Sequence, residues 1–394
     1  MSQKLYIFNP DHDLAIAHGT NHYVSPASAL IFRHDATLLL SWIADKGDYI
    51  LCSEPTTSER WDEIANQLHL PCNIVDNNTI AQCPITQIVP WGWNHNIVQQ
   101  LQQKLPSPLL FPSSQTLHHW RQLSHRQWAG KALSFLQQHS SQPHLVPEAA
   151  QICTQITDIE DYLTQHKEII LKMPWSGSGR GLRHIYTTMT PHQKGWAQNS
   201  ILKQGMVLAE PFRHVIQDFA MEFECKEKAH FIGYSLFYTH HGTYQKNILL
   251  NHTAIERFLS QFIDIEILIE YRELLLTFLN ENFCPTYRGF VGADMFVFEE
   301  NNCYYIHPVV ELNVRMTMGL IAARFTEKYL TEDTSGTLRM RYLQEPNALY
   351  QEDRNLSQQY PLHIVNGKII SGYLSLTPIL ETTQYAIQVL IKNN

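Results

Sequence analysis

The stretch GADMFVFEENNCYYIHPVVELNVR, residues 292–315, contains two β-prone runs joined by a pair of asparagines. Asparagine tolerates the positive φ of a tight hairpin turn, so the pair predicts a two-residue turn between two antiparallel strands. With Asn301 and Asn302 in the turn, a regular register places Asp294 opposite Val309. Pro308 can bulge the second strand and shift this register, because proline donates no ladder hydrogen bond.

Strand alternation places four polar side chains on one face of this hairpin, namely Asp294, Glu311, Asn313 and Arg315. Two carboxylates and an amide oxygen beside a cation suit Mg²⁺ with a bound triphosphate, because Mg²⁺ prefers a few hard oxygen ligands. Asp294, Glu311 and Asn313 are therefore the predicted metal ligands. The alternative is a solvated strand face that carries a surface ion pair.

A second stretch, LKMPWSGSGRGLRHI at residues 171–185, has glycines at 177, 179 and 181 between two β-prone runs. Glycines let backbone N–H groups approach a phosphate chain closely, and Lys172 adds a positive charge beside them. The predicted phosphate-binding residues of this loop are Ser176, Gly177, Ser178, Gly179 and Arg180. No G-x-x-x-x-G-K-[ST] motif occurs in the sequence, so a loop between two strands is favoured over a P-loop. A simple turn is the alternative.

Composition limits the class of protein. The chain has 394 residues, 44% hydrophobic and 17% charged, which predicts a folded protein of two or three domains. A net charge of -8 argues against a broad nucleic-acid interface, which needs a basic face. No apolar run is long enough to span a membrane and no signal peptide is evident, so a cytoplasmic protein is expected. The seven cysteines include no C-x-x-C pair, and we expect buried, reduced thiols.

The order of predicted elements indicates the architecture. Strands and helices alternate over residues 1–108, which predicts a parallel, doubly wound α/β domain. The proline-rich LPSPLLFPSS at 105–114 is the candidate linker. A mixed α/β region with antiparallel hairpins follows, and Asn-Gly at 366–367 predicts another hairpin near the C-terminus.

These motifs, in this order, resemble the ATP-grasp superfamily of ATP-dependent carboxylate ligases over most of the chain. KMPWSGSGRGL is similar to the glycine-rich flap of biotin carboxylases, and ELNVR resembles their E-x-N-x-R element. The resemblance implies a domain at 1–108, linker helices and a small lobe at 109–206, a large lobe with the Mg-ATP site at 207–350, and a β-rich extension at 351–394.

The resemblance also implies roles for further residues. LAEPF at 208–212 is similar to the strand that holds adenine, and QDFAMEF supplies an acid for the ribose. GTYQKN at 242–247 resembles G-D-F-R-S-N of ligases that add glutamate to protein tails. SHRQWAGK at 124–131 lies where the family has a phosphate-binding Asp-Lys pair, but here His125 and Arg126 replace those residues. The implied nucleotide contacts are Arg126, Lys172, Glu210, Phe212, Asp218, Lys246 and Asn247.

The expected reaction follows from the resemblance. ATP would phosphorylate a carboxylate, and an amine would attack the acyl phosphate, with Lys172 and Arg315 as the catalytic residues. The substrates would be small carboxylates and amines, or a peptide tail. Asn9, Asp11, His12 and Asp13 follow the first strand and are candidates to contact the acceptor amine; alternatively, 11–13 only cap the next helix. A phosphotransferase and a non-catalytic nucleotide-binding module are the competing hypotheses.

Overall fold

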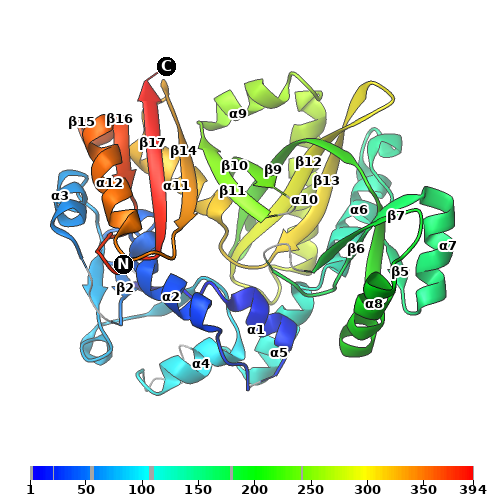
Figure 1. Ribbon diagram of the computed structural model, residues 1–394, viewed down its shortest axis with the longest axis horizontal. Coiled ribbons are helices and arrows are strands. Elements are labelled where there is room, and N and C mark those ends of the chain that lie inside the picture. The colour runs from blue at the N-terminus through cyan, green and yellow to red at the C-terminus, as the bar shows by residue number, and fades with distance from the viewer. Residues whose placement is uncertain are drawn as a thin grey trace.

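The computed structural model describes residues 3–20, 22–53, 57–105, 111–177, 181–240 and 243–393. The described strands form a parallel sheet near the N-terminus, a small antiparallel sheet and a large antiparallel sheet (Figure 1). Ser178, Gly179 and Arg180 of the predicted flap lie outside the described residues.

The N-terminal sheet has the strand order β3-β2-β1-β4, and all of its pairs are parallel. Its strands are β1 (Lys4–Ile7), β2 (Tyr49–Leu51), β3 (Asn73–Val75) and β4 (Gln87–Pro90). Its helical elements are α1 (His12–His18), α2 (Ala27–Asp35), η1 (Thr37–Trp42), α3 (Glu59–Gln67), η2 (Ile80–Gln82) and α4 (His95–Gln102). The predicted parallel sheet is confirmed. Alternation along β1 buries Leu5 in one core and Tyr6 in another, so both faces of this sheet are covered.

The small antiparallel sheet carries the strand that ends at Lys172. Its order is β5-β8-β6-β7, with β5 (Gln151–Cys153), β6 (Glu168–Lys172), β7 (Leu182–Tyr186) and β8 (Val207–Pro211). The helical elements of this part of the chain, which precede the strands or lie between them, are α5 (Ser114–Leu123), α6 (Gln127–His139), η4 (Pro143–Leu145), α7 (Ile156–His166) and α8 (Pro191–Gln204). Asp158 lies in the first turn of α7 and forms a capping box with Gln155.

The large sheet has the order β13-β12-β9-β10-β11-β14-β17-β16-β15. Its strands are β9 (His214–Cys225), β10 (Ala229–His240), β11 (Thr243–Leu249), β12 (Gly289–Glu300), β13 (Cys303–Asn313), β14 (Thr334–Tyr342), β15 (His363–Val365), β16 (Lys368–Ser375) and β17 (Tyr385–Asn393). Its helices are α9 (His252–Leu259), α10 (Ile265–Asn282), α11 (Met318–Tyr329) and α12 (Ala348–Gln359). The Asn366-Gly367 hairpin is confirmed by the pairing of Val365 with Lys368. The last strands pair with β14 through β17, so the predicted C-terminal extension continues the large sheet.

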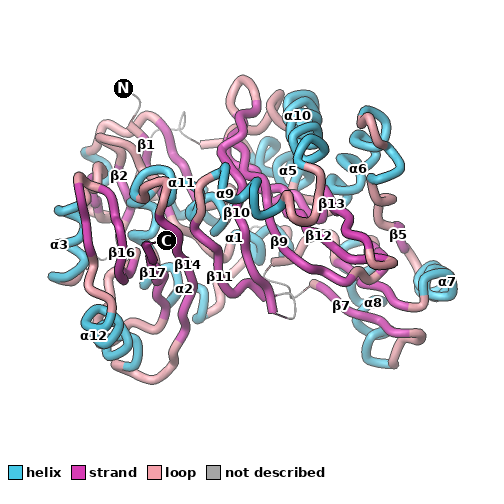
Figure 2. Tube along the Cα trace, turned by 90° about the horizontal axis from the view of Figure 1, so that it is seen from above, coloured by secondary structure: helices cyan, strands magenta, loops and turns pink. Residues whose placement is uncertain are grey.

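Two cores cover this large sheet, and Figures 1 and 2 show the helices that contribute to them. One core packs α6 and α10 against β9, β12 and β13, with Leu133, Leu275 and Val291 fully or almost fully buried. The other core packs α11 between β10, β11 and the N-terminal sheet, and it includes Trp42 and Phe325, which contact each other edge to face. The N-terminal sheet and the C-terminal strands therefore share one core, which fixes the β1–α1 loop against the large sheet.

The structure also tests two expectations from the sequence, which concern membrane-spanning segments and the burial of the cysteines. Within the described residues, no helix has the length and apolar content needed to cross a bilayer. Cys303 is exposed on the hairpin, and Cys72 and Cys83 are only partly buried, which corrects the expectation that all the thiols are buried.

Candidate active site

The β12–β13 hairpin brings two carboxylates face to face. Asn301 and Asn302 have φ of 53° and 60°, and the regular pairing runs from Glu300 opposite Cys303 to Phe296 opposite His307. Between Phe296 and Asp294 the register shifts, so that Asp294 pairs with Glu311. The prediction that Asp294 faces Val309 is therefore wrong. The extra residues on β13 lie at and after Pro308, which cannot donate to the ladder.

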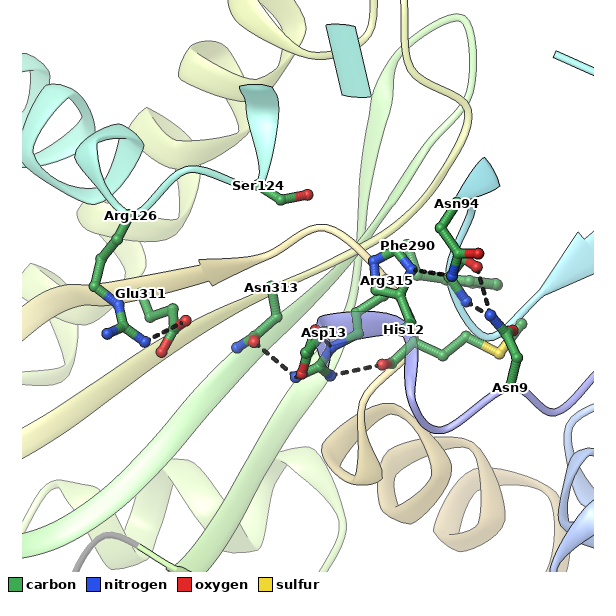
Figure 3. Close-up of polar contacts among 12 residues, drawn as sticks. Asn9, His12, Asp13, Asn94, Ser124, Arg126, Phe290, Glu311, Asn313 and Arg315 are labelled. Atoms are coloured by element: carbon green, nitrogen blue, oxygen red, sulfur yellow. Dashed lines mark hydrogen bonds and ion pairs between the residues drawn. The ribbon is translucent and has the colours of Figure 1, made fainter. Parts of the chain in front are cut away.

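The shifted register concentrates negative charge at one position of the sheet. Burial and the nearby carboxylate of Glu311 raise the pKa of Asp294 to about 7. Arg126 Nη2 donates to Glu311 Oε1 at 2.7 Å, so this ion pair offsets the charge of one of the two acids (Figure 3). Asn313 completes the predicted donor set, and its Oδ1 accepts from Arg315 Nη2 at 3.0 Å. In the part of the chain that the structure describes, no group of three or more His, Cys, Asp or Glu side chains is arranged around one point.

Arg126 ties this acidic pair to the glycine-rich loop. It precedes α6, and its Nη1 donates to the carbonyl of Met173 at 3.2 Å while its backbone N–H donates to Pro174 at 3.0 Å. The neighbouring His125 packs edge to face on Trp175, with 4.4 Å between the ring centroids. Burial, then the charge of Arg121, lowers the pKa of His125 to about 4, so the ring is neutral. Of the two residues that replace the family's Asp-Lys pair, Arg126 therefore points at the site and His125 packs against the glycine-rich loop.

Lys172 and Glu210 form a second buried ion pair. Lys172 ends β6 and Glu210 lies on the adjacent β8, with 2.5 Å between Nζ and Oε2. Burial opposes ionisation of Glu210, but the ammonium of Lys172 outweighs it and lowers the pKa of that carboxyl. Lys172 and Glu210 were both predicted to contact the nucleotide, and the structure brings them into contact with each other. The ion pair joins the end of β6 to the adjacent strand β8, beside the glycine-rich loop.

His307, which sequence reasoning missed, lies next to this pair. It is 5% exposed, and its Nδ1 has no hydrogen-bond partner among the described residues. Its ring centroid lies 4.9 Å from that of Phe296, and burial lowers its pKa to about 4. Register counting from the Asn-Asn turn already places His307 opposite Phe296, on the face that carries Asp294, so this signal was available in the sequence.

A second missed residue, Glu222, lies behind Asp294. It is buried on β9 opposite Gly292, and Thr317 Oγ1 donates to its Oε1 at 2.7 Å. A Cβ at Gly319 would overlap that oxygen, so glycine is required for the carboxyl to fit. Burial raises the pKa of Glu222 to about 8. Alternation from Asp218 through 220 to 222 puts it on the same strand face, which the sequence could have indicated.

The side chains of the other predicted nucleotide contacts differ in their exposure and in the partners that they already have. Asp218 lies opposite Phe296 on the site face and accepts from Thr239 Oγ1 at 2.8 Å. Phe212 directly follows β8 and is 40% exposed. Lys246 lies over the ring of Tyr238, 4.9 Å from its centroid.

Asn247 is occupied by the protein itself. Its Oδ1 accepts from Tyr244 at 2.6 Å, and its Nδ2 donates to the carbonyl of Leu236 at 3.2 Å. The side chain is 1% exposed. These contacts support a packing role for Asn247.

The start of α1 meets the site through Asp13, which lies in the first turn of the helix. Asn9 is 1% exposed and exchanges hydrogen bonds with the backbone of Gly92. His12 is 2% exposed, with Nδ1 3.3 Å from Asn94 Nδ2, and burial lowers its pKa to about 4. Asp11 is 3% exposed and precedes α1, but its side chain makes no capping hydrogen bond. Asn9, Asp11 and His12 are therefore enclosed in the N-terminal region.

Asp13 instead holds Arg315. Arg315 Nε and Nη2 donate to the two oxygens of Asp13 at 2.7 and 2.8 Å, and Nη1 donates to the carbonyl of Met316 (Figure 3). With the bond to Asn313, four of the five guanidinium N–H donors have partners. Gly177 of the flap packs on Asp13, because a Cβ there would lie 2.5 Å from the Asp13 Cβ. The partner of Arg315 is therefore Asp13 of the N-terminal region, where the alternative interpretation expected an ion pair on the surface of the hairpin.

Solved structures provide the comparison for this arrangement. Biotin carboxylase from Campylobacter jejuni, in a complex with an ATP ligand, matches with a TM-score of 0.53 at 10% identity over 100% of this chain and 88% of that one. N5-carboxyaminoimidazole synthetase from Staphylococcus aureus, with ADP, matches with a TM-score of 0.50 at 12% identity over 100% and 95% of the two chains.

A third structure is the biotin carboxylase domain of 2-oxoglutarate carboxylase from Hydrogenobacter thermophilus, crystallised with MgADP and bicarbonate. It matches with a TM-score of 0.51 at 8% identity over 100% of this chain and 87% of that one. No family model matches the sequence. No curated protein matches it either. The structural likeness confirms the expected ATP-grasp fold over the whole chain.

Proposed function

We propose that this protein is an ADP-forming ATP-grasp ligase that activates a carboxylate as an acyl phosphate for attack by an amine. The observation that carries the proposal is the pairing of Asp294 with Glu311, flanked by Arg126, Asn313 and Arg315 on one face of the large sheet. The fold of the three solved structures, each crystallised with an adenine nucleotide, supports the same assignment.

The acidic pair fits a magnesium ion. Burial, followed by repulsion from Glu311 on the paired strand, raises the pKa of Asp294, and a divalent cation would relieve that repulsion. Asp294 and Glu311 would hold the ion, with Asn313 as the neutral oxygen donor. When bound, Mg²⁺ would neutralise charge on the transferring phosphoryl group.

The nucleotide would lie between the small and large lobes. Lys172 is positioned by Glu210 to meet a phosphate oxygen, and Asp218 lies on the sheet face where it can accept from a ribose hydroxyl. Backbone N–H groups of the flap, including Ser176 and Gly177, would cover the phosphates. The predicted roles of Phe212 and Lys246 remain part of this proposal, while the contacts of Asn247 favour packing.

Arg315 would stabilise the acyl group. A carboxylate oxygen attacks the terminal phosphorus of ATP, ADP leaves, and the amine nitrogen then attacks the carbonyl carbon and expels inorganic phosphate. Because Asp13 and Asn313 fix the guanidinium of Arg315, its remaining N–H is already oriented before the substrate binds. Small carboxylates and amines, or a peptide tail, are the proposed substrates, and a cytoplasmic location remains a prediction.

Trapping with hydroxylamine tests the proposal. Wild-type protein with Mg-ATP and a panel of amino acids and small carboxylates should form hydroxamate and ADP together with its true substrate. Arg315→Lys should lose hydroxamate formation by several orders of magnitude and still bind ATP, because an ammonium lacks the planar donor geometry. Arg324→Lys is the matched control, since Arg324 pairs with Glu327 on α11. A phosphate ester that resists hydroxylamine would contradict the ligase and indicate a phosphotransferase.

A further inference from the structure

A cavity of about 200 Å³ lies within the N-terminal region, apart from the proposed nucleotide site. It lies at the carboxyl ends of β1 and β2, and residues on or next to α2 and α4 line it; these two helices are at the lower left of Figure 1. Ligands of parallel α/β sheets bind preferentially outside this edge of the strands. The position alone therefore marks the cavity as a candidate binding site.

Positive charge dominates the polar part of the cavity. Arg33 on α2 and Lys104, just after α4, both line it, and none of its described lining residues is acidic. Burial, followed by the charge of Arg33, lowers the pKa of Lys104, so the two cations are near enough to repel. Among the described residues, Lys104 makes no ion pair with a carboxylate.

Arg33 is held in place for a ligand. Its Nη2 donates to Asp11 Oδ1 at 2.8 Å, and its Nη1 lies 3.3 Å from Gln100 Oε1. Its buried Nε has no hydrogen-bond partner among the described residues. Asp11 neutralises one of the two cations, which leaves one uncompensated positive charge and an unpaired N–H donor.

The remaining wall is apolar. Ile7, Phe8, Leu51 and Leu101 all line the cavity and are each no more than 7% exposed. At about 200 Å³, the cavity is smaller than the roughly 300–1,000 Å³ typical of drug-sized ligand pockets, and it suits a short organic anion.

This cavity and the proposed nucleotide site are each contacted by an aspartate at the start of α1. Asp11 binds Arg33 beside the cavity, whereas Asp13 binds Arg315 beside the acidic pair. The buried His12 lies between them. The two sites thus use different cations and share no lining residue.

We propose that the cavity between α2 and α4 binds a small organic anion, with Arg33 and Lys104 as its cationic contacts and the apolar wall as the contact for its body. The chemistry is that of a short-chain carboxylate or a phosphate ester. The inference does not depend on the proposed ligase activity, because neither nucleotide nor turnover enters it.

The test is calorimetry on the full-length protein without nucleotide, with acetate, butyrate and inorganic phosphate as separate probes. Butyrate should bind about 15-fold more tightly than acetate, since it buries two more methylene groups against the wall. Tighter binding of phosphate than of acetate would identify the phosphate-ester form of the ligand, and the reverse order the carboxylate form. In either case Lys104→Met should weaken binding of the preferred probe by at least about tenfold, through loss of a charge-assisted contact.

Matched variants separate this site from others. Lys46→Met, at an exposed lysine of the same region, should leave anion binding unchanged, and Lys104→Met should leave Mg-ATP binding unchanged. The proposal is overturned if the wild type binds none of the three probes or if Lys104→Met binds them as the wild type does. It is also overturned if Lys172→Met abolishes anion binding, because the probe would then occupy the triphosphate site.

Discussion

Replacing Asp13 by asparagine removes one charge from an ion pair that joins segments 302 residues apart in the sequence. Asp13 belongs to the N-terminal region, and Arg315 follows β13, the strand that carries Glu311. Asparagine keeps the shape of the side chain and one carbonyl oxygen. The substitution therefore tests the charge and the bidentate geometry with little change in packing volume.

The magnitude follows from burial. Both side chains are about one-fifth exposed, at 18% and 19%, and their two bonds measure 2.7 and 2.8 Å. Breaking a fully buried pair costs about 3–5 kcal/mol, and an exposed pair contributes about 0.2–1 kcal/mol. We expect Asp13→Asn to lower the free energy of unfolding by about 2 kcal/mol. Asp161→Asn, at an exposed aspartate of α7, should change it by less than about 0.5 kcal/mol.

A double-mutant cycle in urea measures the interaction. Asp13→Asn, Arg315→Met and the double variant should give a coupling energy of about 1–2 kcal/mol at pH 7. Burial opposes ionisation of Asp13, but Arg315 outweighs it and holds its pKa below the usual range. The coupling is therefore present above the ordinary aspartate pKa and lost as the pH falls through the lowered value. Additive single effects, with a coupling energy within about 0.3 kcal/mol of zero, would refute the bidentate pair.

Four further substitutions test the site. Lys172→Met should weaken ATP binding in calorimetry by about 1.5–3 kcal/mol through loss of a charge-assisted contact, and equal affinity would contradict its role. Asp294→Asn and Glu311→Gln should each abolish magnesium-dependent turnover without unfolding the protein; turnover that needs no divalent ion would contradict the metal assignment. Burial lowers the pKa of His125 to about 4, so its neutral ring contributes stability that is present above pH 6.5 and lost towards pH 4. Between pH 6.5 and 4, the free energy of unfolding of His125→Gln should therefore fall by up to about 3 kcal/mol less than that of the wild type. An equal fall with pH in the two proteins would contradict this prediction.

Local patterns predicted much of the fold. Alternating strands and helices gave the parallel sheet, and the Asn301-Asn302 turn gave the β12–β13 hairpin because both signals act over a few neighbouring residues. The joining of the C-terminal strands to the large sheet was not predictable. A strand pattern does not name its partner, and β17 pairs with β14 across α12, β15 and β16.

In the candidate site, too, local patterns predict one part and the tertiary fold decides the other. Alternation placed Asp294, Glu311 and Asn313 on one face, but the direction of the register shift at Pro308 required the folded sheet. The pairing of Arg315 with Asp13 depends on how the N-terminal region packs against the large sheet, which no motif encodes.

Transfer of oxygen-18 from substrate to phosphate tests the central claim most directly. The carboxylate that yields hydroxamate would be labelled in both oxygens and incubated with Mg-ATP and its amine partner. Formation and breakdown of an acyl phosphate move one labelled oxygen from each consumed carboxylate into inorganic phosphate, and the proposed ligase predicts this stoichiometry. Unlabelled inorganic phosphate, or a phosphate ester that keeps the transferred group, would contradict carboxylate activation.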